Sequence, residues 1–369
     1  MPPSFDELRV RLASTRWSAN APADLRELVR YWHTDFDWRA RERELGRYPH
    51  HRVTVDGAGL HVVRVPGRGP APLPLVLTHG WPSTFYEFWP VISRLTDPGR
   101  HGGDPADAFD VVVPSLPGFA YSPALAGAGS SNRIPHLWHL LMTEIFGYAR
   151  YGAHGGDIGA MVTNRLALEH PHELAGIHVT MPAEPHADPA TLTAEEQRFL
   201  RERIARQESG GAYAHVHRTR PDTLAVALHD SPAGLAAWIV EKWREWSDPM
   251  SHLAADDLLT TLTLYWLTDS IGTSLRVYRD WALGSAGRPE AWSAHVPSGV
   301  DSRPLAPGEL ITVPAGLCLF GTDVPRSWAD RAYADLRHWV RAPRGGHFPA
   351  TEVPDLLAED LRTFFRPLR

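Results

Sequence analysis

The sequence is poor in cysteine and contains no long uncharged stretch. Cys318 is the only cysteine among 369 residues and lies in the apolar run 311–320, so a disulfide framework and a cysteine-based zinc site are excluded. No uncharged stretch reaches the roughly 18 apolar residues of a membrane span, and the N-terminus lacks the apolar centre of a signal peptide. We therefore expect a cytoplasmic protein without a membrane anchor.

Charge of one sign is not concentrated in any segment. The 37 basic and 43 acidic residues give a net charge of −6, and no five like charges are adjacent, which argues against nucleic acid as a partner. Lys242 is the only lysine, a bias that we attribute to a GC-rich coding sequence rather than to the chemistry. The 43% of apolar residues predict a globular protein with a large core.

Hydrophobic periodicity predicts an α/β fold with a mostly parallel sheet. Before residue 50, apolar side chains recur at three- and four-residue steps, which predicts helices, and HRVTV and LHVVRV around DGAG predict a hairpin. Most of the later apolar runs lead into helical segments, so we expect helices on both faces of the sheet. The predicted buried strands are 73–78, 109–116, 150–155, 174–182, 311–320 and 337–344.

The strand pattern stops between 183 and about 300, where helical signals replace it. Thr193 and Glu196 predict a capping box, and Ser231 followed by proline predicts another helix start. We expect this helical insertion to form a cap over the site. The predicted organisation is an N-terminal strap (1–50), an α/β core (51–182 and 301–369) and a helical cap (183–300).

The segment 151–160, YGAHGGDIGA, predicts a nucleophile elbow. Gly155, Asp157 and Gly159 fit the sharp turn between a strand and a helix, in which small neighbours let the helix approach the nucleophile. The chain contains no G-x-S-x-G, and an ionised carboxylate at the tip is already a nucleophile toward an sp3 carbon. A glycine-rich turn in which the aspartate only caps a helix remains the alternative.

Two further residues fall in the chain order that α/β hydrolases use, nucleophile, acid and histidine. His347 in RGGHF follows the last predicted strand, and Asp323 in FGTD directly follows the preceding one. We assign His347 as the base and Asp323 as the acid. Asp330 and Asp335 are fallback acids, although both fall inside a probable helix.

The loop HGWP (79–82) predicts half of an oxyanion hole, because it follows the first core strand and offers backbone N–H groups there. The residue after the nucleophile supplies the other half. We assign the two donors to Trp81 and Ile158. We also hypothesise a cis peptide bond between Trp81 and Pro82, which would aim the Trp81 N–H.

These motifs resemble the microsomal-type epoxide hydrolases of the α/β-hydrolase superfamily, a family with an epoxide-hydrolase N-terminal region. The likeness covers nearly the whole chain. HGWPSTFYEF, PSLPGFAYS, HGGDIGA and RGGHFPATEVPDLLAEDLRTFF are similar to the core motifs of the family, and FDELRVRLASTRW is similar to the start of its strap. The resemblance implies an α/β-hydrolase fold with a helical cap and an N-terminal helical strap.

The resemblance also implies two cap tyrosines that activate the epoxide oxygen, and they fall on Tyr213 and Tyr278. A phenol can donate a hydrogen bond to an ether oxygen and lend a proton as the ring opens. Three features depart from the family. Ile158 stands where the family commonly has tryptophan, the stretch from Asp323 to His347 is short, and the strap is shortened around SANAPADL.

The resemblance implies that the enzyme opens a small-molecule epoxide to a vicinal diol. Asp157 would form a covalent ester, and water activated by His347 would hydrolyse it. No metal or organic cofactor is expected, and a homodimer is plausible. A haloalkane dehalogenase is the nearest rival, although such enzymes usually place a tryptophan where Ile158 stands. The other alternative is a non-catalytic ligand-binding protein, and a role in natural-product biosynthesis or in detoxification stays open.

Overall fold

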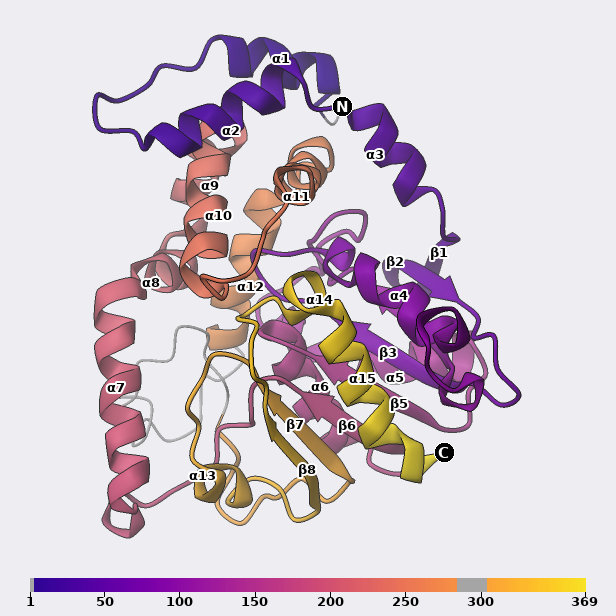
Figure 1. Ribbon diagram of the computed structural model, residues 1–369. Coiled ribbons are helices and arrows are strands. Elements are labelled where there is room, and N and C mark those ends of the chain that lie inside the picture. Colours follow the sequence, from indigo (N-terminus) through magenta and orange to yellow (C-terminus); the bar gives the residue numbers. More distant parts are fainter. Residues whose placement is uncertain (1–2, 284–303) are drawn as a thin grey trace.

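The computed structural model describes residues 3–283 and 304–369 around an eight-stranded sheet (Figure 1). The strand order is β1-β2-β4-β3-β5-β6-β7-β8. The first two strands are antiparallel to their neighbours, and β3 to β8 are parallel. The strands are β1 (His50–Val55), β2 (Ala58–Val65), β3 (Leu73–Thr78), β4 (Phe109–Pro114), β5 (Tyr151–Gly155), β6 (Leu174–Val179), β7 (Ala315–Leu319) and β8 (Leu336–Arg341).

The antiparallel hairpin and all six predicted core strands are confirmed. Asp56 and Gly57, between β1 and β2, both have positive φ, 45° and 74°, as a tight hairpin turn requires. The central strands β5 and β6 are buried along their whole length, which explains their continuous apolar runs. The edge strand β8 is only half-buried, so arginine is tolerated in it.

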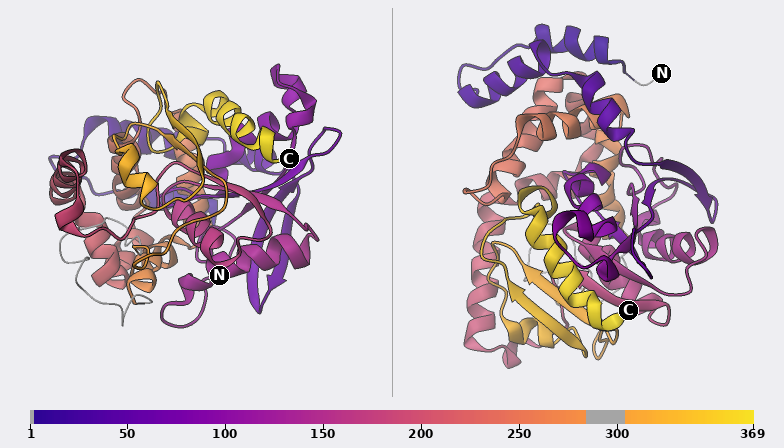
Figure 2. Two further views of the ribbon diagram at one scale, coloured as in Figure 1. Left: turned by 90° about the horizontal axis from the view of Figure 1, so that it is seen from below. Right: turned by 45° about the vertical axis from the view of Figure 1, so that its right-hand side comes forward.

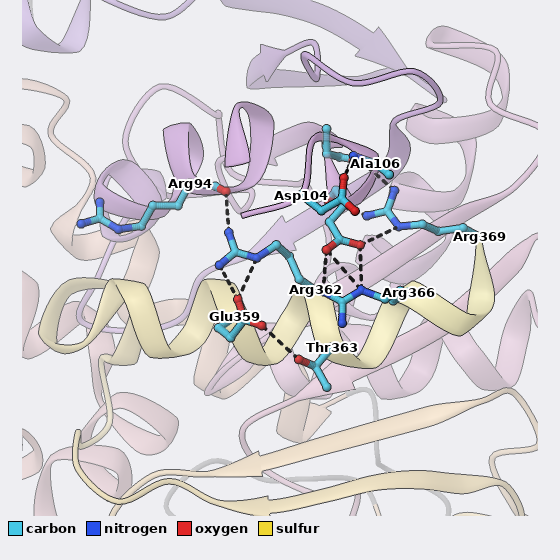
Figure 3. A network of polar contacts seen from close by, with 10 residues as sticks. Arg94, Asp104, Ala106, Glu359, Arg362, Thr363, Arg366 and Arg369 are labelled. Atoms are coloured by element: carbon cyan, nitrogen blue, oxygen red, sulfur yellow. Dashed lines mark hydrogen bonds and ion pairs between the residues drawn. The ribbon is translucent and has the colours of Figure 1, made fainter. Parts of the chain in front are cut away.

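Helices cover both faces of the sheet, as the sequence predicts. On one face α4 (Trp89–Thr96) packs against α15 (Pro354–Phe365), and on the other α5 (Ile134–Leu140) packs against α6 (Ile158–Glu169). Figure 3 shows α15 tied to the rest of the core by arginines. Arg362 pairs with Glu359 and donates to the carbonyl of Arg94.

Short helices fill the connections of the core. They are η1 (Phe85–Phe88), η2 (Pro98–His101), η3 (Pro105–Asp107), η4 (Ser130–Arg133), the π-helix η5 (Leu141–Ile145), η6 (Pro189–Thr191), α13 (Arg326–Asp330), α14 (Pro349–Glu352) and η7 (Arg366–Leu368). Two of them lie near the predicted site residues: η1 follows the HGWP loop, and α14 follows His347.

Among the described residues, six α-helices lie between β6 and β7, and we call them the inserted helices. They are α7 (Ala194–Gly210), α8 (Ala212–Thr219), α9 (Pro221–Asp230), α10 (Pro232–Trp246), α11 (Ala255–Leu267) and α12 (Ile271–Leu283). The predicted capping box of α7 is present, because Thr193 and Glu196 exchange hydrogen bonds. The Ser231 hydroxyl caps α10 by accepting from the Gly234 N–H. Residues 284–303, which include the end of the predicted cap and the first residues of the second core segment, lie outside the described residues.

The N-terminal helices lie across the inserted helices rather than on the sheet (Figures 1 and 2). They are α1 (Phe5–Ala13), α2 (Ala23–Thr34) and α3 (Trp38–Leu45). The indole of Trp32 donates to the Thr263 hydroxyl at 2.9 Å, and the Tyr31 hydroxyl donates to Asp256 at 2.8 Å. The apolar stripes of these helices are therefore buried against α10 and α11.

Across residues 3–283 and 304–369, no single helix is both long and apolar enough to cross a bilayer. One neighbouring pair, α9 and α10, meets the length and composition requirement only jointly, and it is bent by 118°.

Candidate active site

The turn between β5 and α6 has the geometry of the predicted elbow. Asp157 has φ 52° and ψ −126°, a left-handed conformation that is uncommon for a residue with a side chain. A Cβ on Gly159 would overlap the carbonyl oxygen of Thr78, and one on Gly155 would overlap Gly159. Glycine at these positions therefore lets α6 approach β3 and β5 closely enough to present Asp157 at the end of the sheet.

The carboxylate of Asp157 is 7% exposed and has a partner on each oxygen. Its Oδ1 accepts the Trp81 N–H at 2.9 Å, and its Oδ2 lies 3.3 Å from His347 Nε2. Gly80 lies so close that a Cβ there would overlap Asp157. The structure thus brings together the predicted nucleophile, the predicted base and one predicted oxyanion donor.

The two predicted oxyanion donors occupy different local structures. The peptide bond between Trp81 and Pro82 is cis, as hypothesised, and the Trp81 N–H points at the carboxylate. Ile158 is the first residue of α6, so its N–H has no acceptor within the helix. The positive end of the α6 dipole favours negative charge at this point.

His347 lies in the loop between β8 and α14, and 22% of its side chain is exposed. The backbone N–H of His347 donates to the Trp246 carbonyl at 2.8 Å, and the imidazole ring lies 5.1 Å from the Trp246 ring. Burial alone would lower the pKa of His347, but the adjacent Asp157 carboxylate raises it above the usual value. Loss of the negative charge on Asp157 would therefore lower the pKa of the His347 imidazole.

The structure does not bring Asp323 to His347. The Asp323 side chain is 86% exposed, and its Oδ1 lies 3.3 Å from the Arg341 guanidinium. The sequence predicted the loop after β7 correctly but not the direction of the side chain, which solvent and Arg341 stabilise at the surface. The fallback acids Asp330 and Asp335 also pair with arginines, Arg326 and Arg337.

Tyr213 on α8 and Tyr278 on α12, the two tyrosines that the resemblance picks out, lie together beside Trp81. The two phenol rings are 6.1 Å apart, and the Tyr213 ring stacks on the Trp81 indole at 5.4 Å. Burial raises the pKa of both phenols well above their usual range, so both stay protonated donors. The structure therefore places both phenols beside the Trp81 ring.

A cavity of about 490 Å³ opens beside these residues and runs between the core and α7. Asp157, His347 and Tyr213 line one end of it. Apolar side chains form much of the remaining wall, and they include Met161, Phe199, Trp246, Trp281 and Trp328. Its volume lies within the range of about 300–1,000 Å³ that is typical of sites for small molecules.

Two charged residues near the site were missed by the sequence analysis. The Lys242 ammonium is buried and lies 5.2 Å from the centre of the Tyr213 ring, paired with Glu241 and Glu245. Lys242 is the only lysine in the sequence, and this rarity is the feature that could have indicated its role. Glu87 on η1 is buried, and burial raises its pKa to about 7. No short-range pattern could have indicated Glu87, because its surroundings come from distant segments.

Away from this site, His178, His338 and Asp360 form the one group among the described residues whose donor atoms are close enough for a metal ion. Asp360 accepts from both imidazoles, at 2.7 and 2.8 Å. These contacts join β6 and β8 to α15. The expectation that the reaction uses no metal stays a prediction.

Two known families match the chain between residues 3 and 267. Residues 3–88 match the family described as epoxide hydrolase N terminus, and residues 74–267 match alpha/beta hydrolase fold. A putative epoxide hydrolase of Stigmatella aurantiaca is 40% identical over an alignment that covers 99% of this chain and 83% of the relative. The chain belongs to the epoxide hydrolase family. The resemblance found in its motifs and its α/β-hydrolase fold are confirmed.

Other members of the family align with this epoxide hydrolase over most of its length. Epoxide hydrolase 1 of Sus scrofa is 32% identical, with 92% of this chain and 79% of the relative covered. The structure of Aspergillus niger epoxide hydrolase matches with a TM-score of 0.79 at 28% identity, over 99% of this chain and 94% of that one. Juvenile hormone epoxide hydrolase from the silkworm Bombyx mori matches with a TM-score of 0.82 at 26% identity, over 99% and 92%.

Proposed function

We propose that this epoxide hydrolase opens its substrate through a covalent ester on Asp157. The observation that carries the proposal is the position of the Asp157 carboxylate, held by the Trp81 N–H on one side and His347 on the other. In the first step Asp157 attacks one epoxide carbon, and the carbon–oxygen bond breaks. Tyr213 and Tyr278 stabilise the departing alkoxide and protonate it.

In the second step His347 removes a proton from water, which attacks the ester carbonyl. The Trp81 and Ile158 N–H groups stabilise the oxyanion. As it collapses, the bond between the carbonyl carbon and the substrate oxygen breaks, and His347 returns its proton to that oxygen, which releases the vicinal diol. The carboxylic acid left on Asp157 loses its proton, and that proton restores the phenol through solvent. Esterification removes the charge that raises the pKa of His347, so the imidazole becomes neutral when a base is needed. Asp323 does not orient the ring in this conformation, and the carboxylates of Glu87 and Glu352 also favour the imidazolium.

We propose that residues 183–300 act as a cap and residues 1–50 as a strap that holds it. Tyr213 and Tyr278 come from the inserted helices, whereas Asp157 and His347 come from the core. The substrate would then bind between the two parts. The apolar wall of the cavity supports a predominantly apolar epoxide. Cytoplasmic location, independence of cofactors and dimer formation remain parts of this proposal.

The site supports neither a haloalkane dehalogenase nor a non-catalytic binding protein. A dehalogenase would use a side-chain N–H after the nucleophile, and Ile158 has none. A non-catalytic binding protein has no need of a nucleophile, a base and a buried phenol at one cavity. No observation favours either over epoxide hydrolysis.

Turnover of a panel of epoxides tests the proposal. We expect purified protein to convert aryl and bulky polycyclic epoxides to diols, with Asp157→Ala inactive and Asp323→Asn retaining most of its activity. Release of halide from haloalkanes without diol formation from any epoxide would contradict it. Chiral analysis of the diols would also give the regiochemistry.

A further inference from the structure

One carboxylate holds the loop that carries His347. Glu352, at the end of α14, accepts the Gly346 N–H at 3.0 Å and the Phe348 N–H at 2.9 Å. These are the residues on either side of His347. The same carboxylate accepts the Asp248 N–H at 2.7 Å, just beyond the end of α10. Hydrogen bonds to an ionised acceptor are roughly twice as strong as neutral ones.

Further contacts join the loop that carries His347 to the residues at the end of α10. The Gly345 N–H donates to Asp248 Oδ2 at 2.8 Å, and the His347 N–H donates to the Trp246 carbonyl at 2.8 Å. A Cβ on Gly346 would overlap the backbone of Asp248 and Trp246. The loop of the proposed base is thus fixed to an inserted helix rather than to the core alone.

The structure assigns Glu352 as a positioning residue for the water-activating step, an inference that rests on the proposed function. By accepting the N–H groups on both sides of His347, Glu352 fixes the loop so that Nε2 stays beside Asp157. Proton transfer needs such placement, since a general base must lie within hydrogen-bond reach of its water. Ring opening depends less on this loop, because the Trp81 N–H also holds Asp157 and the two tyrosines come from the inserted helices.

Glu352→Gln is the variant that tests this role. The amide keeps one acceptor oxygen, so at least one of the three N–H groups loses its partner. Quenched-flow reaction with styrene oxide and mass analysis of the intact protein measure both half-reactions. We expect ester formation within about two-fold of wild type and ester hydrolysis slowed by at least about tenfold, so that ester accumulates. Unchanged rates, or equal losses in both steps, would overturn the inference.

Three controls keep the outcome interpretable. Asp355→Asn removes a carboxylate that is 75% exposed, three residues along the chain, and should leave both rates unchanged. Should Glu352→Gln fail to fold, Glu352→Asp decides, because the shorter side chain keeps the charge but cannot reach all three N–H groups, and an equal loss in both steps there also overturns the inference. His347→Gln separates the two proposals: without ester in that variant the proposed function fails, whereas ester there but not in Glu352→Gln removes only the role of Glu352.

Discussion

The position of the Asp157 carboxylate depends on residues that have no side chain. Its left-handed backbone conformation costs on the order of 1–3 kcal/mol, which the surrounding packing must offset. Gly80, Gly155 and Gly159 each lie where a Cβ would collide with a neighbour in the elbow. The strain is therefore stored in a turn that aims one carboxylate at the cavity.

The two buried phenols should act together on the departing oxygen. Tyr213→Phe or Tyr278→Phe should each slow ester formation by about 10- to 100-fold, because one donor to the alkoxide is lost. The double variant should nearly abolish the step, while its ester, once formed, is hydrolysed at the normal rate. Single-turnover kinetics measure both steps, and full activity of the double variant would exclude the assignment.

Glu87 should make the stability of the protein depend on pH. Its folded pKa of about 7 lies above the value of an unfolded glutamate, so its contribution is complete at low pH and is lost as pH rises through about 7. Glu87→Gln should therefore stabilise the protein relative to wild type at about pH 8.5, by on the order of 3 kcal/mol, but not at about pH 5.

Urea denaturation at the two pH values measures this difference. Glu27→Gln, a change at an exposed glutamate of α2, is the matched control and should behave like wild type at both. An equal loss of stability in wild type and Glu87→Gln between the two pH values would contradict the prediction.

At the scale of elements, sequence patterns predicted those turns and helix ends whose geometry depends on residues adjacent in the chain. The hairpin at Asp56, the capping box at Thr193 and the elbow at Asp157 all follow from short-range geometry, and all are present. The direction of Asp323 and the contact of the Asp248 N–H with Glu352 depend on more distant segments. Tyr213 and Tyr278 came from the family resemblance alone, since amphipathic packing explains either tyrosine equally well.

The capping box should contribute measurably to α7, which borders the cavity. Thr193→Ala removes the acceptor for the Glu196 N–H at 3.2 Å and should cost about 1 kcal/mol of unfolding free energy. Chemical denaturation measures the loss. Thr193→Ser, which keeps the hydroxyl, should recover most of it, and equal stability of the alanine variant and wild type would contradict the role of the cap.

At the scale of the whole molecule, the N-terminal helices are joined to the inserted helices by buried polar contacts. Trp32→Phe keeps the apolar ring but removes the donor to Thr263, a fully buried hydroxyl. We expect a loss of about 1–3 kcal/mol and a lower melting temperature. Trp17→Phe, at a partly exposed site, is the control, and equal melting of Trp32→Phe and wild type would argue against this joint.

The covalent ester on Asp157 is the central claim, and a single turnover in heavy-oxygen water tests it most directly. With enzyme in excess over styrene oxide, the oxygen added to the diol should come from the Asp157 carboxylate, so the first diol carries no label. The heavy oxygen should appear in Asp157 itself, detectable by mass analysis of its peptide. Heavy oxygen in the diol of the first turnover would contradict the account.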